Sequence, residues 1–190
     1  MRALSGMAGA CAAGLVALGV AAALQAANLS IGKGAGRPDQ PAWAEIGWPF
    51  GVDPWGAGKA FTCSATECGA NVGLYVRAKI GFCDCSRGVN DDEELERVSD
   101  IALVADRYEA SRPGRPIAVA SMGGRSRPYV IAAPGSASGD ALTIAFHDRC
   151  DLVVATAVIG DGRATELEPK ILQFLNSQTV WRWLEKTLGL

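Results

Sequence analysis

Residues 72–80 alternate between apolar and polar or small side chains, and this pattern restricts the fold more than any other part of the chain. Side chains of a β-strand point alternately to its two faces, so the pattern predicts a strand with one face in the core and one in solvent. The expected core face holds Val72, Leu74, Val76, Ala78 and Ile80, and the expected solvent face holds Gly73, Tyr75, Arg77 and Lys79.

Other segments predict an α+β domain over residues 59–190. Strands are expected at residues 60–63, 116–121, 128–132, 141–146 and 152–158, and the last four are joined by short glycine-rich or charged turns typical of antiparallel neighbours. Two C-terminal helices follow, the first opening at a capping box of Thr165 and Glu168 and the second covering residues 178–188. We expect a single domain with a mainly antiparallel sheet, both helices packed on one face, and disulfides that stabilise it.

The N-terminal segment, residues 1–26, is typical of an export signal. No charged side chain lies between Arg2 and Lys33, and residues 3–24 are small or apolar. Such a run behind one positive charge predicts a signal peptide, and it is also nearly long enough to form an uncleaved membrane anchor. We therefore expect an exported, periplasmic protein, or alternatively one anchored in the inner membrane and facing the periplasm.

Residues 27–58 are expected to form an irregular arm. From residue 28 on, this segment holds four prolines, seven glycines and three of the five tryptophans of the chain. Proline removes a backbone donor and glycine weakens helices and strands, so neither a long helix nor a central strand is expected. Its aromatic side chains either cover the domain, which we favour, or form an exposed strip for a partner. They are Trp43, Trp48, Phe50 and Trp55.

Export determines how the cysteines are interpreted. Removal of the signal would leave five: Cys63, Cys68, Cys83, Cys85 and Cys150. Paired cysteines form disulfides by default in an oxidising compartment, and Cys83 is too close to Cys85 to bond it without strain. We expect two structural disulfides that join the first two of these cysteines to the next two, with Cys150 unpaired or replacing one of them. No pair has the spacing of a structural zinc site.

Two alternatives use the same thiols for chemistry. A soft-metal or thiol redox site would draw on Cys83, Cys85, His147 and Cys150. An enzyme would use Cys150 as the nucleophile and His147, the only histidine, as its base. Adjacent polar residues in a turn, however, usually form the turn and have no catalytic role. We therefore expect no catalytic site, no metal and no cofactor.

Two groups of charged residues are further candidates. The acidic run from Asp91 lacks the ligand spacing of a calcium loop and is expected to start a helix over residues 91–99, capped by Asn90. Arginine suits forked recognition of carboxylate or phosphate, and four arginines beside glycine-rich turns could gather around such an anion. These are Arg112, Arg115, Arg125 and Arg127.

The sequences LYVRAKIGFCDC, DDEEL and FLNSQTVWRWLEKTLGL resemble those of a group of small exported bacterial proteins with no assigned function. The resemblance covers most of the chain after residue 26 and implies a bacterial origin and an envelope location, but no activity. The net charge of -2 gives no reason to expect nucleic acid as a partner.

Three functional hypotheses follow. The first is an exported envelope protein without catalytic activity that binds a protein partner or a small ligand through the aromatic arm or the arginine turns. The second is a periplasmic metal-binding or thiol redox protein, and the third is a Cys/His-dependent enzyme. We favour the first because no catalytic motif is found.

Overall fold

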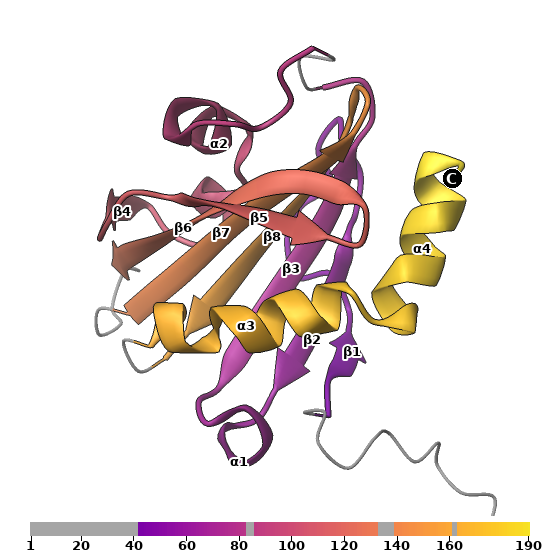
Figure 1. Ribbon diagram of the computed structural model, residues 1–190. Helices are drawn as coiled ribbons and strands as arrows, with labels where there is room; N and C mark the ends of the chain where they lie inside the picture. The colour runs from indigo at the N-terminus through magenta and orange to yellow at the C-terminus, as the bar shows by residue number, and fades with distance from the viewer. Residues whose placement is uncertain (1–41, 83–85, 133–138, 161–162) are drawn as a thin grey trace, which may run out of the picture. The chain divides into compact units, whose positions relative to one another are not determined.

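An antiparallel sheet organises the domain, and eight strands of it lie within the described residues (Figure 1). The computed structural model describes residues 42–82, 86–132, 139–160 and 163–190. The strand order is β1-β2-β3-β8-β7-β6-β4, and β5 pairs with β6 beside β4. The strands are β1 (Ala44–Ile46), β2 (Lys59–Cys63), β3 (Val72–Lys79), β4 (Arg107–Ala110), β5 (Arg115–Val119), β6 (Met122–Ala132), β7 (Gly139–Asp148) and β8 (Asp151–Ile159).

Strands β5 to β8 form the predicted antiparallel series, each pairing with the next. Tight turns join two of these pairs, and each contains a residue with positive φ, Ala120 at 51° and Arg149 at 53°. Strand β3 then pairs antiparallel to β8 over its whole length. The predicted α+β class and the antiparallel sheet are therefore confirmed.

One face of the sheet is covered by the two C-terminal helices, α3 (Ala164–Leu175) and α4 (Gln178–Leu188), as predicted. Leu167, Ile171 and Leu175 of α3 pack on this face in the main apolar core. The predicted capping box is wrong, because α3 begins earlier and Arg163 is its N-cap. Glu168 instead lies inside the helix and turns toward the sheet, where it is buried.

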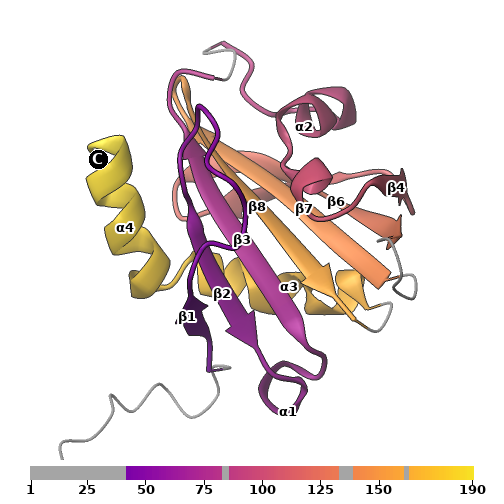
Figure 2. The same cartoon turned by 180° about the vertical axis from the view of Figure 1, so that it is seen from behind.

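The opposite face is covered by helix α2 (Asp92–Val98), the short 3-10 helix η1 (Ile101–Leu103) and the arm. In Figure 2, which views this face, η1 and the described part of the arm cross in front of the strands. The α2 N-cap is Asp91, one residue later than predicted, and its carboxylate accepts from the Glu94 amide at 2.8 Å. A further short helix, α1 (Ala65–Cys68), lies between β2 and β3.

The alternation of residues 72–80 is observed in β3, but the expected solvent face is not exposed. Leu74 and Val76 lie in the main core, as predicted. On the other face, Arg77 is 3% and Lys79 5% exposed, because α2 and the arm cover them. Strand β3 is therefore covered on both faces, and the expectation of a half-exposed strand is wrong.

The aromatic side chains of the arm pack against their own domain, as we favoured. Trp43 stacks on Phe174 of α3 with ring centroids 4.5 Å apart. Trp48 and Phe50 make edge contacts with Tyr75 on the opposite face. Strand β1 also lies within the segment expected to be irregular and pairs with β2.

Candidate functional site

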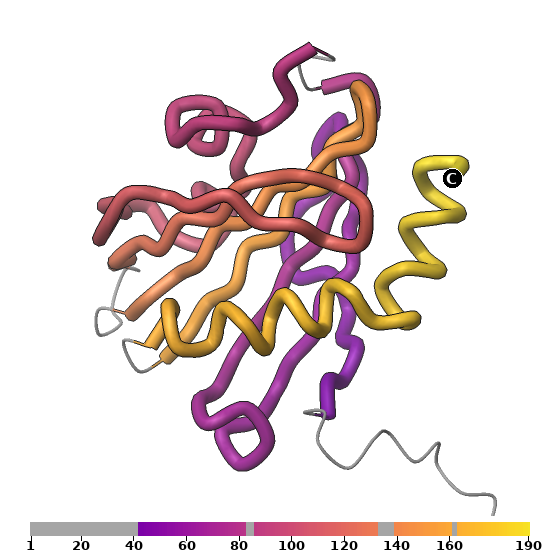
Figure 3. The backbone as a smooth tube through the Cα atoms, in the orientation of Figure 1, coloured from indigo at the N-terminus to yellow at the C-terminus, as the bar shows by residue number. Residues whose placement is uncertain are grey.

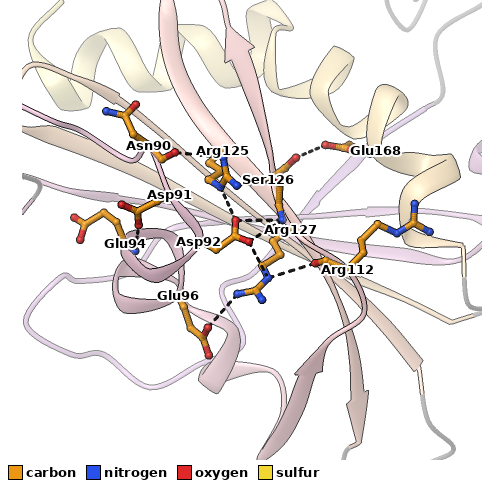
Figure 4. Close-up of polar contacts among 11 residues, drawn as sticks. Asn90, Asp91, Asp92, Glu94, Glu96, Arg112, Arg125, Ser126, Arg127 and Glu168 are labelled. Atoms are coloured by element: carbon orange, nitrogen blue, oxygen red, sulfur yellow. Dashed lines mark hydrogen bonds and ion pairs between the residues drawn. The ribbon is translucent and has the colours of Figure 1, made fainter.

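The two arginines of β6 that face α2 are paired with its carboxylates (Figure 4). Arg125 Nε donates to Asp92 Oδ1 at 2.5 Å, and Arg127 Nη1 donates to Glu96 Oε2 at 3.2 Å. Arg127 Nε also lies 3.7 Å from Asp92 Oδ2. We call these four residues the α2–β6 cluster, in which two cations are balanced by two anions.

Asp92 is the centre of the α2–β6 cluster and is held in its charged form. Burial would raise the pKa of Asp92, but the Gly114 amide, Arg125 and Arg127 outweigh burial and hold this pKa below its ordinary value. The Gly114 amide donates to both carboxylate oxygens, at 3.0 and 3.1 Å. An external anion would therefore have to displace Asp92 from both arginines.

The other two predicted arginines point elsewhere. Arg115 Nε on β5 donates to Glu168 Oε2 at 2.9 Å, and the Ser126 hydroxyl donates to the other oxygen of this carboxylate. The guanidinium of Arg112 points away from the α2–β6 cluster in Figure 4, while its backbone carbonyl accepts from Arg127 Nε at 3.4 Å. The predicted gathering of four arginines around one anion is therefore wrong. Arg115 pairs with α3 on one face of the sheet, whereas Arg125 and Arg127 pair with α2 on the other.

A second charged cluster lies beneath the arm and was not predicted. Arg77 donates to both oxygens of Asp100, from Nε at 2.9 Å and from Nη2 at 2.5 Å. Lys79 Nζ lies 2.9 Å from Asp100 Oδ1 and donates to the Val98 carbonyl at 2.6 Å. Arg77 Nη1 also donates to Asp53 of the arm at 2.5 Å. Two buried cations on β3 thus bind the arm and the segment after α2 to the sheet.

These contacts shift the pKa values of two members of the cluster. The hydrogen bond from Arg77 lowers the pKa of Asp53, and this effect exceeds the opposing effect of desolvation. Burial would lower the pKa of Arg77, but Asp100 and Asp53 together raise it above its ordinary value. Both groups are therefore charged across the physiological pH range, as expected for a structural network.

The cysteines show a different pairing from the one predicted. Cys63 bonds Cys68 across α1, with Cα atoms 5.9 Å apart, so the expected links from these two to Cys83 and Cys85 are wrong. Cys63 and Cys68 can reach each other because the short helix α1 turns the chain back toward β2. Cys150 is also disulfide-bonded, and its partner lies outside the described residues, as do Cys83 and Cys85.

His147 lies near the end of β7, two residues before the turn that holds Cys150. Its imidazole packs against Gly88, where an added Cβ would lie 1.8 Å from Nε2. Its Nδ1 atom is buried and has no hydrogen-bond partner among the described residues. Because Cys150 is bonded, a nucleophilic role for it would require reduction of its disulfide, and the enzyme hypothesis stays a prediction.

Strand β4 forms one end of the sheet, and sequence analysis missed it because it expected no strand between residues 80 and 116. Its residues Arg107, Tyr108 and Glu109 are exposed, and Tyr108 is 38% accessible. Two charged residues beside one aromatic residue give a weak apolar signal, which explains the omission. The alternation of the charged residues Arg107 and Glu109 with Tyr108 and Ala110 is the signal that could have identified an edge strand.

The α2–β6 cluster is linked to the β4 edge through Tyr129. Tyr108 makes an edge contact with Tyr129 of β6, with ring centroids 5.9 Å apart. The same Tyr129 ring also contacts Arg127, whose guanidinium lies 5.5 Å from the ring centre. The chain of contacts from Glu96 through Arg127 and Tyr129 to Tyr108 links α2 to the edge. A surface hollow of about 420 Å³ lies beside Tyr108 and Val130.

Comparison of the chain with protein-family models, with curated proteins and with solved structures gives no match. Within the described residues, no group of three or more His, Cys, Asp or Glu side chains is arranged to hold a metal ion. Every helix in this part of the chain is too short or too polar to cross a membrane. The candidate site is therefore defined by geometry alone, as the β4 edge and the α2–β6 cluster behind it.

Proposed function

We propose that the protein is exported to the bacterial envelope and acts there without catalysis, by binding another protein along the β4 edge. It does so in the periplasm, either free or held by residues 1–26. The disulfides at Cys63–Cys68 and at Cys150 are consistent with this location, since disulfides persist in oxidising compartments.

The observation that carries the proposal is the contrast between the interior charges and the β4 edge. The arginines and carboxylates of the α2–β6 cluster neutralise one another, and the arm aromatics are packed on the sheet. The β4 edge instead presents exposed side chains, and among the described residues β4 pairs with a strand on one side only. An open sheet edge can add a strand from another chain through backbone hydrogen bonds.

Site-specific cross-linking in living cells tests this proposal. A photoreactive amino acid at position 108 should give a covalent adduct with another polypeptide in the envelope fraction. The same substitution at Lys186, on the exposed side of α4, is the matched control and should give none. Equal adduct formation at both positions, or none at position 108, would contradict the proposal.

A small-ligand role has one observation in its favour. A hollow of about 500 Å³ lies at the end of β2, β3 and β8, lined mainly by apolar surface and including Thr62, Tyr75 and Val158. If it binds apolar ligands, a fluorescent anilinonaphthalene sulfonate should bind the folded protein, and Thr62→Phe should weaken that binding. Binding that Thr62→Phe leaves unchanged would exclude this hollow as the site.

A further inference from the structure

The backbone of β4 has a defined outward side. The Ser111 amide donates to the Pro128 carbonyl at 3.0 Å, continuing the register in which Ala110 opposes Tyr129. Residues of an antiparallel strand face their neighbour with alternate backbone groups. Glu109 therefore directs its N–H and C=O toward β6, and Tyr108 and Ala110 direct theirs toward the open edge.

The side chains beside Tyr108 carry opposite charges that no other described residue pairs with. Within the described part of the chain, neither Arg107 nor Glu109 has an ion-pair or hydrogen-bond partner, and the residues opposite them on β6, Ala132 and Val130, are apolar. By contrast, the cations of the α2–β6 cluster and the buried cations of β3 are all matched. Among the described residues, Arg107 and Glu109 thus remain a free cation and a free anion, two residues apart on the same face of the edge.

We propose that the partner is a second copy of this chain. Its β4 pairs with this β4 around a two-fold axis that passes between the two Tyr108 residues. The inference rests on the proposed function and names the partner of the same edge. Antiparallel pairing with Tyr108 opposite Tyr108 places Arg107 of each copy opposite Glu109 of the other, so both ion pairs form at once. A shift that sets Ala110 opposite itself would remove both pairs, so the charges select the register.

The surroundings of the edge agree with this pairing. Tyr108 and Val130, which is 46% exposed, lie on the two faces of the sheet beside the edge, and a second strand would cover part of each. Figure 3 shows β4 and β5 following one another along β6. The β5 part carries Pro113 just before it and Pro116 within it, residues that block strand addition, whereas β4 has none. Because four residues form the contact, we expect a reversible dimer.

Sedimentation velocity of the purified protein over a range of concentrations tests the pairing, with Arg107→Glu, Glu109→Arg and the double exchange R107E/E109R as variants. The wild type should show reversible dimers. Each single variant places like charges opposite each other in both pairs and should weaken dimerisation about tenfold or more, while the double exchange restores it to near the wild-type value. A wild type that stays monomeric, or a dimer that the single variants leave unchanged, would overturn the inference.

Photo-oxidative coupling of tyrosines tests the register independently of the charge variants. The chain has three tyrosines, and Tyr108 should form dityrosine with its counterpart in the second copy. Tyr108→Phe should abolish the covalent dimer, and Tyr75→Phe, away from the edge, should retain it. If no dimer forms but the cell-envelope cross-link at position 108 attaches a different protein, this inference fails and the proposed function stands. If neither product forms, both fail.

Discussion

Replacing Asp100 by asparagine should destabilise the fold because this carboxylate holds two buried cations. The side chain is 8% exposed, accepts hydrogen bonds from Arg77 and forms an ion pair with Lys79. Removing one partner of a buried ion pair costs about 3–5 kcal/mol, since the remaining charge stays desolvated. Asp53 still pairs with Arg77, and the Val98 carbonyl still accepts from Lys79, so the lower end of that range applies. We expect Asp100→Asn to lower the free energy of unfolding by about 3 kcal/mol.

Urea unfolding at neutral pH, followed by tryptophan fluorescence and without reductant, measures this loss. The urea midpoint should fall while the slope stays constant, and the melting temperature should drop by about 6–12 °C. Asp106→Asn is the matched control, because Asp106 is exposed, and its effect should stay within about 0.5 kcal/mol. A loss below about 1 kcal/mol for Asp100→Asn, or equal losses in the two variants, would refute a structural role for the buried cluster.

Three other predictions concern packing, pH and the disulfide. A Cβ at Gly124 would lie 2.1 Å from a β7 carbonyl oxygen, so Gly124→Ala should cost about 2–3 kcal/mol in urea unfolding. Gly123→Ala, with open space around it, should change stability by no more than about 0.5 kcal/mol, and equal effects would count against the β6–β7 packing. Because the folded-state pKa of Asp92 is lowered, its contribution to stability is complete above about pH 4 and is lost as the pH falls through that lowered pKa. Asp92→Asn should therefore reduce stability at neutral pH and flatten the acid decline, and parallel pH profiles would contradict this. Joint replacement of Cys63 and Cys68 by serine should cost about 2 kcal/mol, from the entropy of closing a short loop, and an unchanged urea midpoint would exclude a stabilising bond.

The strands and C-terminal helices could be predicted because local pattern determines them. The alternation in residues 72–80 follows from the geometry of a strand, and the apolar stripe of Leu167, Ile171 and Leu175 follows from helical spacing. The start of α3 was not predictable from the sequence. A threonine followed three residues later by a glutamate fits a capping box at a helix start, but the same pattern fits the interior of a helix, where Thr165 and Glu168 lie. Only the tertiary partners Ser126 and Arg115 give Glu168 its buried position.

The candidate site was only partly predictable, because charge pairing depends on contacts between distant segments. The sequence pointed to Arg125 and Arg127 but not to Asp92 as their partner, which is 33 residues from Arg125. It likewise gave no reason to bury Arg77 and Lys79, whose anions come from the arm and from the segment after α2. Strand β4 was missed because it is short and holds two charged residues and only one large apolar side chain, Tyr108, which together give a weak strand signal.

Site-resolved amide hydrogen exchange tests the central claim, that the β4 edge binds another polypeptide, most directly. The measurement compares the protein purified in its cellular complex with the same protein after dissociation. The amides of Tyr108 and Ala110, which face the open edge, should be protected in the complex and exchange rapidly after dissociation. The amide of Glu109, which faces β6, should be protected in both. Equal exchange of the two edge amides in both states, or a change confined to α4, would contradict the claim.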